Sequence, residues 1–339
     1  MTAAAEPLRA LVTGANGFVG AHLVAELLTR GYRVKALVRK TSDVTNIKHD
    51  AVELVFGDVT AMDALTVAMN GVDVVFHLAG ITKAYASAEF NRVNVQGTAN
   101  VMTAAATRDE GPPRVVHVSS IAAAGPCASD VASSESDACH PVSRYGESKA
   151  QGEVRVRALA DRVPSSIVRP PIVYGPRDRD VFELFKMAAG GWVVQAGFTP
   201  RRFSIVHVHD LVRGLCLVAE RGQTLSQTDL SRGVYYIADD GPYLWGELGK
   251  AAASGFGRSA RVVRVPDAVT FGAAYFGELI GKIRKKPFVL NLDKAREGTA
   301  GHWYCSSDRA RNELGFAILH PLATGFAETA HWYKENGWV

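Results

Sequence analysis

Three glycines stand where a buried strand is expected to turn into a helix. Gly14 and Gly17 lie between an apolar run over residues 8–13 and an apolar helical stripe over residues 19–28, and Gly20 lies near the start of that stripe. Gly14 allows a tight turn, Gly17 lets the backbone come close to a pyrophosphate, and Gly20 lets helix and strand pack closely. Free amides at the start of such a helix attract an anion. The segment predicts a phosphate-binding turn, although two residues separate its first two glycines, whereas one residue separates those of the G-x-G-x-x-G form.

Apolar runs alternate with helical segments through the first half of the chain. Further strands are expected at residues 33–38, 52–56, 72–78, 114–119 and 166–169, and a helix at residues 90–106. Continuous apolar strands are typical of a parallel sheet covered on both faces, and the alternation implies right-handed βαβ crossovers. The sequence therefore predicts an α/β fold, a Rossmann-type doubly wound parallel sheet.

The regular alternation ends near Pro176. Beyond it, helices are expected at residues 181–188, 244–253 and 266–283, and short strands at residues 204–208 and 234–238. We expect residues 1–175 to form a dinucleotide-binding domain, to which the chain returns within residues 203–238. Residues 176–202 and 239–339 are expected to form a smaller substrate-binding lobe.

A tyrosine and a lysine are spaced by one helical turn. Tyr145 and Lys149 share a helix face, and Ser120 lies upstream at the end of an apolar run. A phenol with a pKa of about 10 is a poor base at neutral pH, and a nearby ammonium is expected to lower that pKa. Alone, this pair is compatible with an ordinary exposed helix. Together with the glycine turn, it predicts a nicotinamide-dinucleotide enzyme that uses a tyrosine as its acid and base.

The ends of the second and third strands bear on the choice of cofactor. NAD enzymes usually place an acidic residue after the second strand, but this chain has Arg39 and Lys40, which can pair with a 2′-phosphate. We expect NADP(H) rather than NAD(H), with solvated surface cations as the alternative interpretation. Asp58 after the third strand could accept a bond from the adenine amino group or could be a turn residue.

Further motifs complete a family pattern. Residues 78–80 are Leu-Ala-Gly, residues 94–98 are Asn-Val-Gln-Gly-Thr, and residues 169–176 are Arg-Pro-Pro-Ile-Val-Tyr-Gly-Pro. In this order, with the glycine turn and the Tyr145 motif, they resemble the extended short-chain dehydrogenases/reductases over nearly the whole chain.

The resemblance implies roles for individual residues. Tyr145 would exchange a proton with the substrate oxygen, Lys149 would hold the nicotinamide ribose and bias Tyr145, and Ser120 would hydrogen-bond the carbonyl. Asn94 would support this catalytic group from a neighbouring helix. The residues expected to contact the cofactor are Gly14, Asn16, Gly17, Phe18, Val19, Gly20, Arg39, Asp58, Val59, Leu78, Ala79, Gly80, Lys149, Pro170 and Ile172.

Local features favour one branch of that family. Residues 120–126 resemble the Ser-Ile…Ala-Gly-Pro segment of 3β-hydroxysteroid dehydrogenases, and Arg39 also fits the dihydroflavonol reductases. Pro170-Pro171 stands where sugar epimerases commonly have an asparagine for the diphosphate. We predict an NADP(H)-dependent oxidoreductase that interconverts a ketone and a secondary alcohol on a hydrophobic small molecule. The alternatives are a nucleotide-sugar epimerase with tightly bound cofactor and, less favoured because Tyr145 and Lys149 are kept, an NADP-sensing regulatory protein.

Composition excludes several other classes. The 339 residues hold 38 Lys and Arg against 34 Asp and Glu without long runs of one charge, so nucleic acid is not an expected partner. The four cysteines show no metal-binding or disulfide spacing. The residues before the first strand are too few for a signal peptide, which favours a cytoplasmic protein. The family resemblance suggests a homodimer through the helices near Asn94 and Tyr145.

Two other segments of the chain bear on its function. His207, His209 and Asp210 offer ligand atoms on an expected strand, but no further ligand is evident from the sequence, so we expect no metal site. An apolar stripe within residues 266–287 predicts a lid or core helix of the substrate lobe rather than a membrane-leaning helix. We therefore expect no membrane contact.

Overall fold

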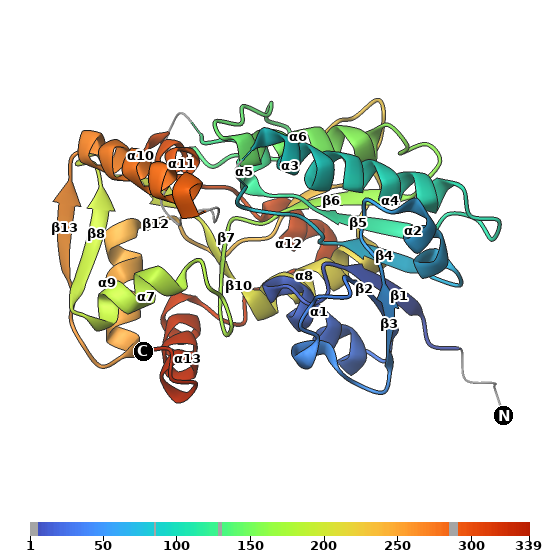
Figure 1. The fold of residues 1–339 in the computed structure, drawn as a ribbon, viewed down its shortest axis with the longest axis horizontal. Coiled ribbons are helices and arrows are strands. Elements are labelled where there is room, and N and C mark those ends of the chain that lie inside the picture. Colours follow the sequence, from blue (N-terminus) through green and yellow to red (C-terminus); the bar gives the residue numbers. More distant parts are fainter. Residues whose placement is uncertain (1–5, 85, 128–130, 285–290) are drawn as a thin grey trace.

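A seven-stranded parallel sheet forms the centre of the computed structural model, which describes residues 6–84, 86–127, 131–284 and 291–339. Its strand order is β3-β2-β1-β4-β5-β6-β11, so the direction of winding reverses between β1 and β4 (Figure 1). The strands are β1 (Arg9–Thr13), β2 (Arg33–Val38), β3 (Val52–Phe56), β4 (Val74–His77), β5 (Arg114–Val118), β6 (Ser165–Arg169) and β11 (Val234–Tyr236). The predicted fold class is confirmed.

Helices cover both faces of the sheet (Figure 1). One face carries α1 (Phe18–Thr29), α8 (Val208–Arg221) and α12 (Asp308–Leu314), whose apolar side chains share one core with the strands. The other face carries α2 (Met62–Met69), α4 (Gly97–Ala106) and α6 (Arg144–Arg157), which share a second core. The strands are buried on both sides, which explains their continuous apolar runs.

A second body of structure packs beside the carboxyl ends of the strands. Its helices are α7 (Phe182–Ala189), α9 (Trp245–Gly255), α10 (Asp267–Arg284), α11 (Leu292–Thr299) and α13 (Leu322–Glu335). Its strands form pairs: β8 (Trp192–Ala196) with β13 (Arg261–Val265), β9 (Arg202–Phe203) with β12 (Tyr243–Leu244), and β7 (Ile172–Tyr174) with β10 (Ile205–His207). Phe185, Val193, Leu248, Phe326 and Tyr333 belong to its core.

The structure corrects two sequence-based expectations. The helix expected at residues 90–106 is divided into α3 (Ser87–Phe90), a π-helical segment over Asn91–Gln96, and α4. The strand expected at residues 204–208 ends at His207, and α8 begins at Val208, so His207 and His209 do not share a strand face. Helix α8 has a strongly amphipathic pattern that the sequence reading overlooked. The apolar residues 266–283 form α10 as expected.

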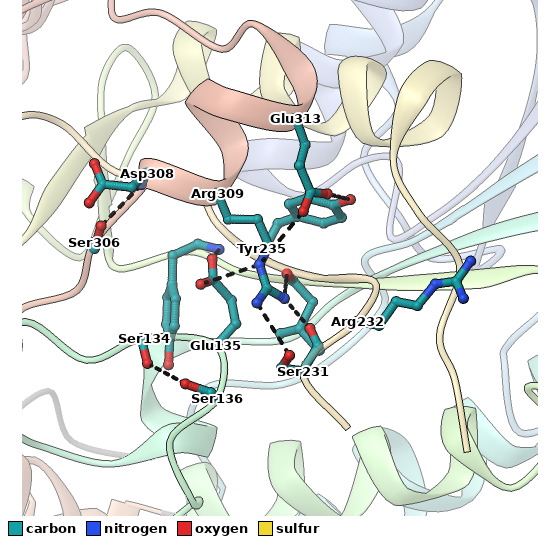
Figure 2. Close-up of polar contacts among 12 residues, drawn as sticks. Ser134, Glu135, Ser136, Ser231, Arg232, Tyr235, Ser306, Asp308, Arg309 and Glu313 are labelled. Atoms are coloured by element: carbon teal, nitrogen blue, oxygen red, sulfur yellow. Dashed lines mark hydrogen bonds and ion pairs between the residues drawn. The ribbon is translucent and has the colours of Figure 1, made fainter. Parts of the chain in front are cut away.

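A polar network fastens the loop after α5 (Ile121–Ala124) to the edge strand β11. Figure 2 shows the Arg309 side chain of α12 between Glu135 of this loop and Ser231. Glu135 is buried and accepts a hydrogen bond from the Tyr236 amide at 3.1 Å, and the Tyr235 hydroxyl donates to Glu313 at 2.7 Å. The loop and α12 therefore cover the last strand of the sheet, an edge that would otherwise be open to pairing.

A buried ion pair joins α6 to the sheet. Arg169, at the end of β6, donates from Nε and Nη2 to the two carboxylate oxygens of Glu153 at 2.9 and 2.7 Å. Ser119 donates to the same carboxylate at 2.6 Å, and both charged side chains are 3% exposed. Burial opposes the charge on Glu153, but Arg169 and Ser119 hold the pKa of its carboxyl below the usual value. This bidentate geometry fixes the helix that carries Tyr145 and Lys149.

We expect Glu153→Ala to lower the free energy of unfolding by about 3–5 kcal/mol, because it leaves the Arg169 guanidinium buried and unpaired. Urea denaturation measures the change. Glu147→Ala, on the exposed face of the same helix, is the matched control and should change the free energy by less than about 0.5 kcal/mol. Equal stability of the two variants would show that the ion pair does not hold α6.

Candidate active site

The glycine turn has the conformation that a phosphate-binding loop requires. Gly14 has a φ of +70°, which favours glycine, and a Cβ there would lie 2.8 Å from the Ala79 amide nitrogen. A Cβ on Gly20 would lie 2.2 Å from the Gly14 carbonyl oxygen, so only glycine lets α1 come this close to β1. Gly17 precedes α1, whose start has no capping side chain. The amides of the first turn are therefore available to an anion, beside half-buried Asn16, Phe18 and Val19.

The ends of β2 and β3 present cations and one partnered carboxylate. Arg39 and Lys40 follow β2 and are exposed. Asp58 accepts hydrogen bonds from the Thr60 amide at 2.9 Å and the Thr60 hydroxyl at 2.8 Å. Partial burial opposes its charge, but these bonds and the nearby Arg39 lower the pKa of Asp58. Asp58 thus has the turn role that the sequence allowed, while Val59 is buried against Gly97.

The segment after β4 lies between the glycine turn and the catalytic residues. The Ala79 amide, which follows Leu78, donates to the Thr13 hydroxyl at 3.1 Å, next to Gly14. A Cβ on Gly80 would lie 3.1 Å from Asn94 Oδ1 and 3.9 Å from Lys149 Nζ. The structure therefore brings the expected cofactor segment at residues 78–80 against both Asn94 and Lys149.

Ser120 and Tyr145 lie together at the starts of two helices. Ser120 is the N-cap of α5, and its hydroxyl accepts a hydrogen bond from the Ala122 amide at 3.1 Å. Tyr145 lies in the first turn of α6, close enough to the Ser120 hydroxyl for that hydroxyl to lower the pKa of the phenol. The Pro170 carbonyl accepts from the Ile121 amide at 2.9 Å, which ties the loop between β6 and Ile172 of β7 to the Ser120 turn.

The electrostatics of Tyr145 differ from the sequence-based expectation. Burial raises the pKa of its phenol, against lowering effects of the hydrogen bond with Ser120 and of the Lys294 charge. The expectation that Lys149 lowers this pKa is wrong for this structure, because the Lys149 ammonium donates instead to the Val118 carbonyl at 2.7 Å. Burial lowers the pKa of Lys149 itself to about 8. The phenol is therefore protonated at neutral pH and can act as an acid.

Both polar side-chain atoms of Asn94 are hydrogen-bonded within the protein. Its Oδ1 accepts from the Ile81 amide at 2.9 Å, and its Nδ2 donates to the Ile81 carbonyl at 3.0 Å and to the Ser148 hydroxyl at 2.9 Å. These contacts join the segment after β4 to α6, between Tyr145 and Lys149. Asn94 is a positioning residue, and the π-helical segment that holds it is a feature often found at functional sites.

Helix α11 supplies three residues that sequence reasoning missed. Asp293 accepts from the backbone amides of Arg144 and Tyr145, each at 3.2 Å. The Lys294 ammonium lies 5.7 Å from the centre of the Tyr145 ring and pairs with Glu297 at 2.6 Å. Ser143, the N-cap of α6, donates to the other oxygen of Glu297 at 2.6 Å. No local pattern in the sequence indicates that residues so distant from Tyr145 would meet it.

Two hollows meet at Lys294. A small cleft is lined by Tyr145, Phe90 and Lys83 together with residues of α10 and α11, including Lys294. A larger pocket of about 400 Å³ lies between β8, β13 and α10, and Lys294 lines it as well. Its wall is mainly apolar: Val194, Phe203, Trp245, Val265, Val269 and Ala273. An apolar chamber therefore shares Lys294 with the cleft beside Tyr145.

The fold and this site define a nicotinamide-dinucleotide oxidoreductase. The NAD dependent epimerase/dehydratase family matches residues 10–233, and the chain belongs to this family, within the extended short-chain dehydrogenases/reductases. The predicted family, enzyme class and nicotinamide cofactor class are confirmed.

Individual relatives agree with this assignment. The chain is 35% identical to a ceramide reductase of Caulobacter vibrioides, over 97% of this chain and 95% of that protein. It is 28% identical to a 3-beta-hydroxysteroid dehydrogenase of Mycolicibacterium neoaurum, over 96% and 92%. A crystal structure of a dTDP-glucose 4,6-dehydratase from Streptomyces venezuelae with NAD bound superposes with a TM-score of 0.76 at 25% identity and covers 98% of each chain. The likeness to reductases and dehydrogenases that the motifs indicated is confirmed.

The lowered pKa of Lys149 predicts a pH dependence. We expect carbonyl reduction to require the phenol proton of Tyr145 and the ammonium of Lys149, of which Lys149 loses its proton first as the pH rises. We expect the reduction rate at limiting substrate to be constant at low pH and to fall above a pH of about 8. In Lys149→Arg, whose guanidinium stays charged, any residual rate should not fall in this range. A wild-type profile that stays flat well above pH 8 would contradict this assignment.

Proposed function

We propose that the protein is an NADP(H)-dependent reductase that interconverts a ketone and a secondary alcohol on a hydrophobic small molecule. The observation that carries this proposal is the apolar pocket of about 400 Å³ that adjoins the Tyr145 site at Lys294. A pocket with a mostly apolar wall and few polar groups binds an apolar body and orients it by one polar group. The similar ceramide reductase and steroid dehydrogenase, by their names, act on such molecules.

The residues present fit a nicotinamide dinucleotide. The glycine turn and the uncapped start of α1 would hold the pyrophosphate, and Lys149, beside Gly80, would hold the nicotinamide ribose. When bound, the nicotinamide supplies or accepts the hydride. In reduction, Ser120 hydrogen-bonds the substrate oxygen and Tyr145 gives it the phenol proton. Asn94 connects α6 to the segment after β4 through its hydrogen bonds to Ser148 and Ile81.

NADP(H) is supported by the residues after β2. Arg39 and Lys40 offer charge for a 2′-phosphate, and no acidic side chain occupies the residues between Val38 and Ser42. The Ser42 hydroxyl is buried and makes no hydrogen bond within the described part of the chain. The Ser42 amide donates to the Arg39 carbonyl at 2.9 Å, so this hydroxyl and the arginine belong to one turn. A phosphate oxygen is a suitable acceptor for both the Ser42 hydroxyl and the Arg39 guanidinium.

A nucleotide-sugar epimerase is the less favoured alternative, because two arginines whose charge could hold a sugar diphosphate, Arg179 and Arg201, have other partners. Arg201 pairs with Asp267 at 2.8 Å and donates to the Ala196 carbonyl at 2.8 Å. The Arg179 guanidinium lies 5.6 Å from the centre of the Trp338 ring. Arg201 is also part of the apolar pocket wall, where its charge is balanced by Asp267.

We expect Tyr145→Phe to abolish turnover while NADPH binding, followed by fluorescence, stays within about twofold of wild type, because the variant removes only the proton donor. Tyr32→Phe, just before the amino end of β2 and so at the opposite end of the parallel sheet from Ser120, is the matched control and should keep full activity. Loss of NADPH binding in Tyr145→Phe would show that the site is misplaced. Retained turnover would exclude Tyr145 as the acid.

We expect Arg39→Ala to raise the KM for NADPH roughly 10- to 100-fold, the equivalent of a charge-assisted hydrogen bond of about 1.5–3 kcal/mol. The KM for NADH should hardly change, because NADH has no 2′-phosphate. Arg33→Ala, at the other end of β2, controls for a loss of surface charge. Equal effects on NADPH and NADH would contradict the proposed role of Arg39.

A further inference from the structure

Four histidines from distant parts of the chain meet outside the active site. His207 ends β10, His209 lies in the first turn of α8, His320 precedes α13 and His22 lies in α1. Ring centroids lie 5.0 Å apart for His207 and His209, 4.4 Å for His207 and His320, and 4.9 Å for His22 and His209. One ring nitrogen from each of His207, His209 and His320 lies within 4.8 Å of the other two. The sequence suggested no further ligand beyond His207, His209 and Asp210, because His320 and His22 are remote from them along the chain.

The polar atoms of one histidine in the cluster, His207, are buried without a hydrogen-bond partner among the described residues. The His207 side chain is 1% exposed. A buried polar group without a partner costs about 1–3 kcal/mol, and native structures contain few of them. A neutral imidazole has a lone pair that a metal ion can use.

The hydrogen bonds behind His209 leave one of its nitrogens free to bind. The Pro176 carbonyl can only accept, so His22 donates to it from Nε2 at 2.9 Å, which leaves His22 Nδ1 as an acceptor. His209 Nε2, 3.2 Å from that atom, must then carry the proton and donate. The lone pair of His209 is therefore on Nδ1. Metal-binding histidines are usually held in this way, with the second ring nitrogen donating to a fixed acceptor.

A buried carboxylate holds the segment that carries His320. Asp210 accepts from the backbone amides of Leu319 and His320, at distances down to 2.9 Å. One of its oxygens also lies 3.3 Å from His320 Nδ1. Asp210 and, at 3.8 Å from His320 Nε2, Glu328 place negative charge next to the three imidazoles. His209 is exposed and His320 partly so, which gives an ion access from solvent.

We propose that His207, His209 and His320 bind a divalent transition-metal ion, with Zn²⁺ as the best match, and that His22 and Asp210 position two of these ligands. Three imidazoles with one open position suit Zn²⁺, and other imidazole-binding ions such as Co²⁺ fit the same set. With Zn–N bonds of about 2.0–2.1 Å, binding would draw the three nitrogens to about 3.4 Å from one another. The ion would tie the start of α8 to the segment before α13, and none of its ligands belongs to the Ser120–Tyr145–Lys149 site.

The test uses the full chain without an affinity tag, treated with EDTA and dialysed. Zn²⁺ is titrated in competition with a chromogenic chelator, and Co²⁺ is titrated by its visible absorption, which reports tetrahedral nitrogen coordination. We expect one ion per chain. His320→Gln and His209→Gln should each weaken Zn²⁺ binding by at least about tenfold, and so should the positioning variant His22→Phe. His331→Gln, which alters an exposed histidine of α13, is the matched control and should bind as wild type.

Thermal unfolding gives a second readout that does not depend on activity. Zn²⁺ should raise the Tm of the wild type and of His331→Gln but not that of His320→Gln, because only a folded site binds the ion. Circular dichroism confirms that each variant is folded. Binding of less than one ion per chain, or Zn²⁺ affinity in His320→Gln equal to that of wild type, would overturn the proposal.

Discussion

The buried ion pair between Glu153 and Arg169 is the interaction on which the rest of the site depends. It joins α6 to the end of β6, and Ser119, at the end of β5, donates to the same carboxylate. Tyr145 and Lys149 lie on this helix, so their height above the sheet follows from the position of Glu153. A buried charge is tolerated only when it is paired and hydrogen-bonded, and the two oxygens of Glu153 meet this requirement with a fixed geometry.

The second body of structure completes the site as well as covering it. Its helix α11 contributes Asp293, which accepts from the first amides of α6, and Lys294, which lies over the Tyr145 ring. Lys294 also borders the apolar pocket. Helix α11 therefore lies next to both Tyr145 and the apolar pocket. No helix in the described part of the chain combines the length and apolar character needed to cross a membrane.

The parts of the site that the sequence predicted are those set by local chain geometry. The glycine turn and the Tyr145–Lys149 spacing each lie within one strand–helix or helix unit, and their residue types determine the local structure. Contacts between distant segments could not be predicted in this way, which is why Asp293, Lys294 and His320 were missed. The effect of Lys149 on Tyr145 was predicted wrongly for a related reason: helical spacing gives a shared face, but the Val118 carbonyl determines where the ammonium points.

The most direct test of the central claim is NADPH oxidation by the purified protein with a series of ketones of increasing apolar size, including long-chain amino ketones and 3-ketosteroids. The expected result is turnover with NADPH and a kcat/KM that rises with the apolar area of the substrate, because the ketone would lie near Tyr145 and the apolar body in the pocket beyond Lys294. Absence of turnover with every ketone, together with conversion of a nucleotide sugar without added cofactor, would contradict it and identify an epimerase.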